Sequence, residues 1–358
     1  METSFAFDYA IERIDMKKFL NTLFITNEKA YLSLDGKTIK VTVDHQLAGQ
    51  FPLHTLENII CFSYNGASPA LMGACAEEGI GLSFYTPFGK FLCRINGENH
   101  GNVLLRKKQY RVSDDTAASC QIARNMILGK VYNCRWSIDR TLRDHSMRVN
   151  TEQCKITINY LNSSLPKIKN EEDLDSLRGL EGECASLYFK IFDELILNQK
   201  EDFSFHGRNK RPPIDNINAM LSFGYTLLAN DCANALEGVG LDSYIGFLHR
   251  DRPGRDSLAL DLMEELRPIM VDRFVVSLIN NRQIQGKDLV KAENGAVTFT
   301  DKGKKKFLTA WQERKRSSIT HPYLKEKICW GLVPHVQSLL LARYLRGDID
   351  GYPPFLWK

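Results

Sequence analysis

The sequence predicts an α+β fold of two domains, a β-rich N-terminal domain followed by a larger all-α-helical domain. Two observations predict it. From residue 16 to about residue 105, apolar and polar residues alternate over short stretches, as in strands; from about residue 115 onward, apolar residues recur every three or four positions, as in helices. With 358 residues, 43% of them hydrophobic, the chain is long enough to form two cores.

We place the N-terminal β-rich domain at residues 16–108 and the helical domain at 109–358, with the basic stretch 106–111 as the linker between them. Residues 1–15 precede Met16, where the strand-like pattern begins. We interpret them as a leader, either a remnant of cloning or the result of an upstream start.

In the N-terminal domain the strongest local signal is Asp35-Gly36, a dipeptide that favours a tight hairpin turn. Alternating runs at 30–34 and 38–43 flank it and are predicted to be the strands of the hairpin. A short helix should begin after its N-cap Ser68 and end at Gly79. The other expected strands lie at 59–62, 80–85 and 91–95.

The helical domain should contain long helices at 115–143, 171–199, 213–237, 257–281 and 326–346. No run approaches the roughly 18 apolar residues that a membrane span needs, and the N-terminus lacks the basic start and apolar core of a secretory signal. The nine cysteines stand singly, without a CxxC pair, which argues against a zinc ribbon, an iron–sulfur cluster or a disulfide framework. We therefore expect a cytoplasmic protein, not bound to a membrane, whose cysteines are mostly buried and reduced.

Positive charge is clustered, although the net charge of +4 is mild. A basic run is usually a solvated face, but several in one chain favour a surface that binds phosphate groups. Tyr225 is a further candidate, either for stacking on a base or for packing in the core. The basic candidates for contacting nucleic acid are Arg208, Arg211, Arg250, Arg252, Lys304, Lys305 and Lys306.

Glu181 lies on the apolar stripe of the helix predicted at 171–199, for which Asn170 is the expected N-cap. A carboxylate on such a stripe faces the core or a cleft, where it needs a cation or a metal as partner. The alternative is an ordinary ion pair with an arginine. Gly179 and Gly182 bracket Glu181 and suggest that DNA or another helix approaches the backbone closely there.

A second acidic group lies on the helix predicted at 257–281. Asp261 and Glu264 are three residues apart, so they project from one face, although such pairs are common on solvated helices. Pro268 cannot donate to the carbonyl of Glu264 and should bend the helix there. His249 precedes this helix in an arginine-rich segment; a single histidine is more often structural than a ligand.

Glu181, His249 and Glu264 together offer two carboxylates and one imidazole from three separate elements, with Asp261 as a third acid nearby. Oxygen ligands with a single nitrogen favour Mg²⁺ or Mn²⁺ over zinc, and no HExxH motif is present. The chemistry that this set indicates is metal-assisted phosphoryl transfer.

Three motifs occur in order along the chain: 177–189, which contains Glu181; 207–225, which begins Gly-Arg-Asn-Lys-Arg-Pro-Pro; and Gly246-Phe-Leu-His, which leads to 257–268. Together with 64–72 they resemble the CRISPR-associated integrase-endonuclease family that installs new spacers. The resemblance covers most of the chain from Met16 onward, and its details are similar to subtype I-C systems.

The resemblance implies that Glu181, His249 and Glu264 bind the metal and that Asp261 contributes to catalysis. It implies that the 3′-hydroxyl ends of short prespacer DNA are joined to a CRISPR repeat by transesterification, in antiviral defence. It also implies a homodimer, a small ferredoxin-like adaptation subunit that joins two such dimers, and in some systems a partner nuclease with an iron–sulfur cluster. Double-stranded DNA is then the substrate.

Two other functions stand beside this one. A stand-alone nuclease could use the same metal site to hydrolyse branched DNA, and the sequence does not separate it from an integrase. A non-catalytic DNA-binding scaffold would need none of the ligands, so the placement of Glu181 on an apolar stripe argues against it. A metabolic enzyme is not indicated, because the sequence contains no P-loop and no GxGxxG after a strand.

Overall fold

The computed structural model of the protein describes residues 22–56, 58–86, 91–95 and 103–358. The predicted leader 1–15 and the start of the strand pattern at Met16 lie outside these residues. The described chain divides into two compact units. The first comprises the described residues between 22 and 95 with Phe307–Ile319 and Lys327–Val336, and the second comprises residues 103–306, Thr320–Glu326 and Gln337–Lys358.

The described residues between 22 and 95 of the first unit form two small sheets. One has four strands in the order β1-β5-β6-β7, with β1, β5 and β6 parallel and β7 antiparallel to β6. The other is the antiparallel meander β2-β3-β4. The strands are β1 (Thr22–Ile25), β2 (Ala30–Asp35), β3 (Thr38–Val43), β4 (Gln46–Pro52), β5 (Asn58–Cys61), β6 (Gly81–Tyr85) and β7 (Phe91–Ile95).

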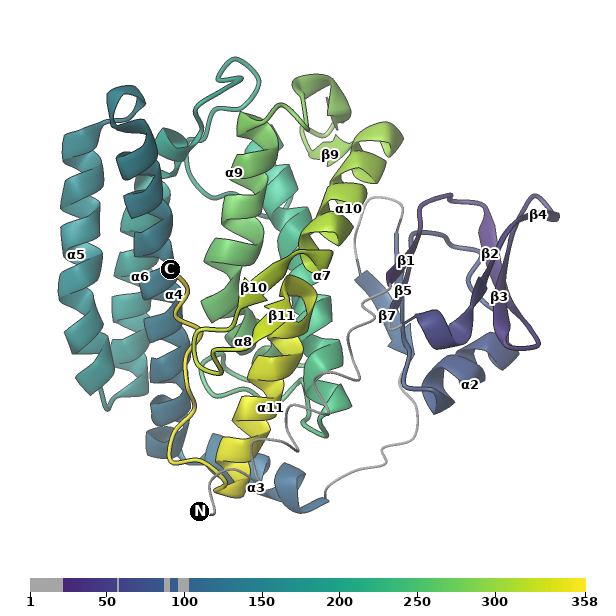
Figure 1. Ribbon diagram of the computed structural model, residues 1–358, viewed down its shortest axis with the longest axis horizontal. Helices are drawn as coiled ribbons and strands as arrows, with labels where there is room; N and C mark the ends of the chain where they lie inside the picture. Colours follow the sequence, from purple (N-terminus) through teal and green to yellow (C-terminus); the bar gives the residue numbers. More distant parts are fainter. Residues whose placement is uncertain (1–21, 57, 87–90, 96–102) are drawn as a thin grey trace. The chain divides into compact units, whose positions relative to one another are not determined.

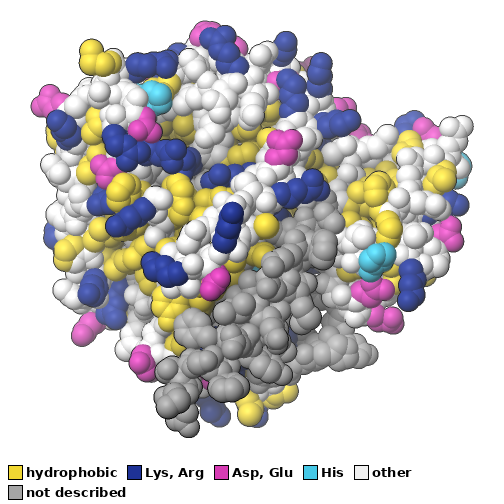
Figure 2. Space-filling model, in the orientation of Figure 1, with side chains coloured by type: hydrophobic (Ala, Val, Ile, Leu, Met, Phe, Trp, Pro, Cys, Tyr) yellow, Lys and Arg dark blue, Asp and Glu magenta, His cyan; other side chains and the backbone are white. Residues whose placement is uncertain are grey.

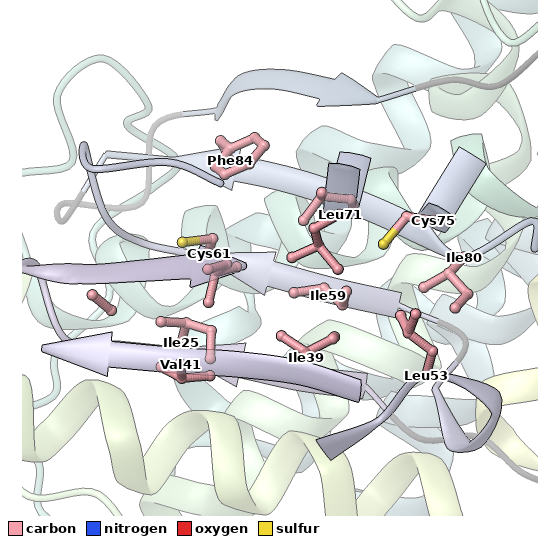
Figure 3. Close-up of a cluster of buried hydrophobic side chains, with 13 residues drawn as sticks. Ile25, Ile39, Val41, Leu53, Ile59, Cys61, Leu71, Cys75, Ile80 and Phe84 are labelled. Carbon is pink, nitrogen blue, oxygen red and sulfur yellow. The ribbon is translucent and has the colours of Figure 1, made fainter. Parts of the chain in front are cut away.

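The core of this unit lies between the sheets and the helix α2 (Pro69–Glu77). Figure 3 shows Ile39 of β3 and Leu71 and Cys75 of α2 around Ile59 of β5, and all four side chains are buried. Burial of these apolar groups is the main force that stabilises the unit.

Local signals in this unit are confirmed. β2 and β3 pair with Asp35 opposite Thr38, and Gly36 takes a φ of +58°, as a tight hairpin turn requires. Ser68 caps α2 by accepting a hydrogen bond from the Leu71 N–H at 3.2 Å. The edge strand β4 was not predicted, because its residues are mostly exposed and do not alternate in polarity.

The second unit is built mainly from helices, and α4, α5 and α6 run side by side in it (Figure 1). α4 also packs against α8, so it lies between the helices that carry the two predicted glutamate ligands. The helices after residue 103 are α3 (Val103–Asp114), α4 (Thr116–His145), α5 (Thr151–Asn170), α6 (Leu174–Lys190), α7 (Asn216–Gly238), α8 (Ser257–Arg267), α9 (Arg273–Asn280), α10 (Asp301–Arg316) and α11 (Val333–Arg346).

Three predictions for residues 103–358 need correction. The stretch 106–111 is not a linker but lies within α3, which is held because the buried Gln109 side chain donates to the carbonyls of Asp242 and Ile245 at 2.8 and 2.9 Å. Helices α5 and α10 were not predicted. The region is also not all-helical, since it contains the short strands β8 (Leu289–Lys291), β9 (Val297–Phe299), β10 (Ser318–Thr320) and β11 (Lys327–Cys329).

The predicted helix at 257–281 is confirmed together with its irregularity. α8 ends at Arg267, Pro268 begins a five-residue π-helical turn η4 (Pro268–Asp272), and α9 continues to Asn280. A proline cannot donate to the preceding turn, and a wider turn is one way for a helix to accommodate it. The acidic residues of α8 therefore lie just before a change in helical geometry, as expected.

The C-terminal residues 352–358 form no helix or strand but pack into the second unit. Tyr352 and Phe355 are buried. Asn133 of α4 donates to the Phe355 carbonyl at 2.8 Å and accepts from the Trp357 N–H at 3.0 Å. Glu265 of α8 accepts the Phe355 N–H at 2.8 Å and the Tyr352 hydroxyl. This segment thereby ties α4 to α8.

All nine cysteines are free, and seven of them are buried, which confirms the prediction of unpaired cysteines that are mostly buried. Among the residues that the structure describes, no helix is both long enough and apolar enough to cross a bilayer.

Candidate metal and nucleic-acid site

Three helices of the second unit bring charged side chains to one point. The ammonium of Lys130, on α4, contacts Glu181 Oε1 on α6 and lies 2.6 Å from Glu264 Oε2 on α8. The lysine side chain is only 2% exposed, and a buried ammonium is unfavourable unless it is paired. Two carboxylates that are distant in sequence therefore converge on one cation. Glu181 has the cationic partner that its place on the apolar stripe requires, and that partner is a lysine.

Glu264 is buried and strongly biased toward its charged form. Arg267, one turn later on α8, lies 3.2 Å from Glu264 Oε1. Burial raises the pKa of the Glu264 carboxyl, but Arg267 and Lys130 outweigh it and lower that pKa from 4.5 to about 2. His249 adds to the lowering of this pKa. Glu264 is therefore ionised at neutral pH, as a metal ligand must be.

Asp261 orients His249. Its Oδ1 lies 2.5 Å from His249 Nδ1 and 3.0 Å from the His249 backbone nitrogen, and its Oδ2 accepts the N–H groups of Phe247 and Leu248 at 2.6 and 2.9 Å. A fully buried carboxylate with these contacts acts as an acceptor, so the Nδ1 proton of His249 points at Asp261. Nε2 is then the nitrogen that remains for a ligand.

The loop before α8 is shaped to present these N–H groups. A Cβ on Gly246 would lie 2.8 Å from Asp261 Oδ2, so no larger residue fits there. Arg178 of α6 donates to the Leu248 carbonyl through Nε at 2.9 Å and through a terminal nitrogen at 2.6 Å. The helix that carries one predicted ligand thus also holds the loop of His249.

The donor set suits a hard divalent cation, since it has two carboxylates and one imidazole. Glu264 Oε2 is buried and accepts no well-aligned hydrogen bond, although the Lys130 ammonium is within ion-pair distance. In the described part of the chain, no cluster of three or more His, Cys, Asp or Glu side chains can hold a metal ion as it stands. The Lys130 ammonium lies where the two carboxylates meet.

The start of α6 differs from the prediction. Asn170 is the last residue of α5, and Asp173 caps α6 by accepting the Ser176 N–H at 2.7 Å. A Cβ on Gly179 or on Gly182 would meet no described atom within 4 Å. No helix of the described chain therefore approaches these glycines, and approach by DNA stays a prediction.

Lys130 and Arg267 are charged residues of the site that the sequence analysis did not name. Lys130 lies on the buried face of α4, one turn after Met126 and one turn before Cys134. Lys130 could have been found by the same signal that identified Glu181, namely a charged residue on the apolar stripe of a helix. Arg267 follows Glu264 by three residues, which is the spacing of a helical ion pair.

Arg208 and Tyr225 belong to a packed layer. Arg208 donates to the side chain of Asn218, and its guanidinium lies 5.2 Å from the centroid of the Tyr225 ring. The Tyr225 hydroxyl donates to Asp272, and Arg267 lies 5.7 Å from the same ring. The packing alternative is therefore the one that the structure supports for Tyr225, and Arg208 is already engaged within the protein.

The remaining basic candidates differ in exposure. Arg211, Arg252 and Lys305 are exposed, and Arg250 is exposed while it donates to Asp175 at 3.2 Å. On the face shown in Figure 2, Lys and Arg side chains are spread among hydrophobic and acidic ones.

Two lysines of α10 are less exposed than the sequence suggests. Lys304 is 5% exposed and lies on the buried face of its helix, and not at the surface where the sequence placed it. Lys306 lies 2.7 Å from the buried carboxylate of Asp288. Lys305, between them, points outward because successive residues face different sides of a helix.

Comparison with known proteins gives a consistent result. The model of the family described as CRISPR associated protein Cas1 matches residues 23–313. A CRISPR-associated endonuclease Cas1 of Chlorobaculum tepidum is 46% identical over 343 residues, and one of Rhodospirillum rubrum is 48% identical over 347; each match covers 96% of this chain and 100% of the relative. A CRISPR-associated exonuclease Cas4/endonuclease Cas1 fusion of Geobacter sulfurreducens is 32% identical over 342 residues, which cover 94% of this chain and 60% of the fusion.

Solved structures agree on the fold. A casposase bound to integration product superposes with a TM-score of 0.80 at 24% identity, covering 94% of this chain and 93% of the casposase. The Cas6-RT-Cas1–Cas2 complex gives a TM-score of 0.77 at 21% identity, covering 95% of this chain and 36% of the matched chain. With a family model that matches most of its length and relatives aligned from end to end, the chain belongs to the Cas1 family of CRISPR-associated proteins.

Proposed function

We propose that this chain is a metal-dependent DNA integrase-endonuclease of CRISPR adaptation. It joins the 3′-hydroxyl ends of short prespacer duplexes to a CRISPR repeat by transesterification. Glu181, His249 and Glu264 bind Mg²⁺ or Mn²⁺, and Asp261 supports catalysis by orienting His249. The chain works in the cytoplasm in antiviral defence, in a system of subtype I-C.

The observation that carries this proposal is the convergence of Glu181 and Glu264 on one cation. The helix that bears Glu264 also bears Asp261, which orients the imidazole of His249. Ion pairs of this kind are costly to bury, and three helices contribute to this one. The names of the relatives, which are CRISPR-associated endonucleases, support nuclease chemistry at this site.

Each side chain has a definite part. A divalent metal would supply Lewis acidity at the scissile phosphate. Glu181 and Glu264 provide the negative charge that holds such a cation, and Arg267 keeps Glu264 ionised. His249 offers Nε2 as a nitrogen ligand because its Nδ1 is held by Asp261. The exposed Arg211, Arg250 and Arg252 are available for phosphates of the DNA.

We also propose the partners. The chain forms a homodimer, and a small ferredoxin-like adaptation subunit bridges two such dimers on double-stranded DNA. The matched complex that contains Cas1 and Cas2 supports the small subunit. The Cas4/Cas1 fusion supports an additional partner nuclease, for which we expect an iron–sulfur cluster.

A strand-transfer assay tests the reaction. The purified chain is mixed with a labelled duplex that has 3′-hydroxyl ends and with a supercoiled plasmid that contains a repeat. Reactions contain Mg²⁺ or Mn²⁺, with and without the small subunit. We expect labelled plasmid that disappears with EDTA and with Glu181→Ala.

The matched control is Glu183→Ala. Glu183 lies on the same helix, is exposed and accepts a hydrogen bond from the Tyr160 hydroxyl at 2.6 Å, so its loss should leave joining intact. Plasmid nicking without label transfer would favour the stand-alone nuclease on branched DNA. Full joining by Glu181→Ala would overturn the metal assignment, and no metal-dependent chemistry under any condition would favour the non-catalytic scaffold.

A further inference from the structure

Lys130 is the more deeply buried of the two cations paired in the candidate site, with a side chain 2% exposed against 13% for Arg267. It lies on α4, whereas its two carboxylate partners lie on α6 and α8. The residue before it, Gly129, fixes how closely α4 approaches α8, because a Cβ there would lie 2.9 Å from the Cβ of Glu265. The packing of α4 against α8 therefore fixes the position of the ammonium next to the carboxylates.

The ion pairs that include Lys130 and Glu264 contain equal numbers of cations and carboxylates. Two cations, Lys130 and Arg267, face two carboxylates, Glu181 and Glu264. Within this group the lysine contacts both carboxylates, whereas Arg267 pairs with Glu264. Without the ammonium, two partly or fully buried carboxylates would face one another without a shared counter-ion, which is unfavourable.

A divalent metal held by Glu181 and Glu264 would need the same position. A second cation at that point would be repelled by the ammonium, because like charges at contact distance disfavour each other. A lysine is suited to leave, since its charge sits at the end of a flexible four-carbon stem. Arg267 is not, because its guanidinium also lies over the rings of Tyr225 and Phe189, at 5.7 and 6.0 Å.

We propose that Lys130 is an exchangeable internal counter-cation. Its ammonium holds the two carboxylates of the metal-free site together and withdraws from them when the divalent metal binds, so that metal and ammonium compete for one position. The inference rests on the metal site proposed above and assigns Lys130 as a positioning residue that sets the metal affinity.

Metal binding tests this directly. The full chain and its variants are titrated with Mn²⁺, and free Mn²⁺ is followed by its electron paramagnetic resonance signal. Lys130→Met removes the competing charge and keeps a similar stem. If the paired form holds about nine-tenths of the metal-free molecules, the apparent Kd for Mn²⁺ should tighten about tenfold.

The melting temperature of Lys130→Met should respond differently without and with metal. Without metal, Lys130→Met should melt below the unchanged protein, because the carboxylates lose their counter-ion. With saturating Mn²⁺ it should gain more in Tm than the unchanged protein does. Lys200→Met, which removes a lysine paired with Asp193 outside the site, should leave the Kd for Mn²⁺ unchanged.

Nuclear magnetic resonance of lysine side-chain nitrogens provides a test in the unmodified chain, should Lys130→Met fail to fold. The Lys130 Nζ resonance, assigned with Lys130→Arg, should shift on addition of Mg²⁺. Equal or weaker Mn²⁺ binding by folded Lys130→Met, or a Lys130 resonance that ignores bound Mg²⁺, would overturn the exchange. Absence of Mn²⁺ binding in every protein, with Glu181→Ala no different, would instead overturn the metal site itself.

Discussion

Two acidic residues of α8, Asp261 and Glu264, differ in role because different groups contact their carboxylates. Asp261 and Glu264 are neighbours on one helical face, yet Asp261 is saturated by N–H groups of the His249 loop and Glu264 faces two cations. A spacing rule places both on one face but cannot distinguish their roles. The distinction depends on the loop and on α4, which are distant in sequence.

The sequence alone identified the acidic residues of the candidate site but not the cation that pairs with two of them. Glu181, Glu264 and Asp261 were recognisable because acids on apolar or kinked helices need an explanation. Lys130 is equally anomalous, but its significance requires knowing that α4 packs against both α6 and α8. No local pattern contains that information.

Asp261→Asn should weaken Mn²⁺ binding and strand joining by roughly 10- to 100-fold, because the amide cannot accept from every N–H that now points at the carboxylate and no longer fixes His249. Titration with Mn²⁺ and the joining rate measure the two effects. Asp288→Asn is the matched control, since it also removes a buried carboxylate but one that pairs with Lys306. Equal losses in both variants would show that general destabilisation is the cause.

His321 should make stability depend on pH. Burial lowers the pKa of its imidazole from 6.5 to about 4, although the hydrogen bond with Gln337 opposes the shift. Its Nδ1 accepts the Leu324 N–H at 3.2 Å, so that nitrogen carries no proton in the folded state. Because the folded pKa lies below the unfolded one, protonation favours unfolding, and stability should fall as the pH drops from about 6.5 toward 4.

Urea unfolding of the unchanged protein and of His321→Asn, measured across this pH range, isolates the effect. The difference between them should change by on the order of 3 kcal/mol. Groups common to both proteins cancel in that difference, including Glu265, whose pKa burial raises to about 7 and whose contribution has the opposite sign. Parallel stability curves for the two proteins would contradict the assignment.

At the level of helices and strands, short sequence signals correctly predicted the features that depend only on neighbouring residues. The Asp35-Gly36 turn, the Ser68 cap and the change of geometry at Pro268 were all predicted and are present. Elements stabilised by tertiary contacts were missed. α5 contains an internal proline, Pro166, and owes its place to packing against α4.

Glycines on two helices should respond oppositely to alanine. Gly129→Ala places a Cβ 2.9 Å from Glu265, so it should push α4 from α8 and destabilise the fold by about 1–3 kcal/mol. Gly179→Ala meets open space within α6 and should stabilise by up to about 1 kcal/mol. The free energy of unfolding in urea measures both. Equal destabilisation by the two substitutions would mean that α6 is packed differently.

The whole molecule depends on contacts between distant parts of the chain. The first compact unit contains the described residues between 22 and 95 together with Phe307–Ile319 and Lys327–Val336, which come much later in the chain. Residues 352–358 likewise tie together α4, which begins more than 200 positions earlier, and α8, which begins nearly 100 positions earlier. Changes in hydrophobic periodicity can place a domain boundary along the sequence, but they cannot show that a later segment packs with an earlier domain. The two-part organisation was predictable, but this interleaving was not.

Phe355→Ala tests how much the C-terminal segment stabilises the second unit. Phe355 is fully buried, so its truncation should cost roughly 3–5 kcal/mol in the free energy of unfolding. It should also weaken Mn²⁺ binding, since the segment ties α4 to α8. Leu356→Ala, at a partly exposed neighbouring position, should cost less. A smaller loss for Phe355 than for Leu356 would show that the segment is not anchored as described.

The same segment gives the protein an optical reporter. Trp357 donates its backbone N–H to Asn133, three residues beyond Lys130 on α4, and its ring lies 4.5 Å from the guanidinium of Arg273. The emission of an indole is sensitive to a nearby charge, and a shift of α4 during ligand binding would alter that distance. With only four tryptophans in the chain, replacing Trp136, Trp311 and Trp330 by phenylalanine would leave one fluorophore through which stopped-flow mixing could follow events at the site without an attached dye.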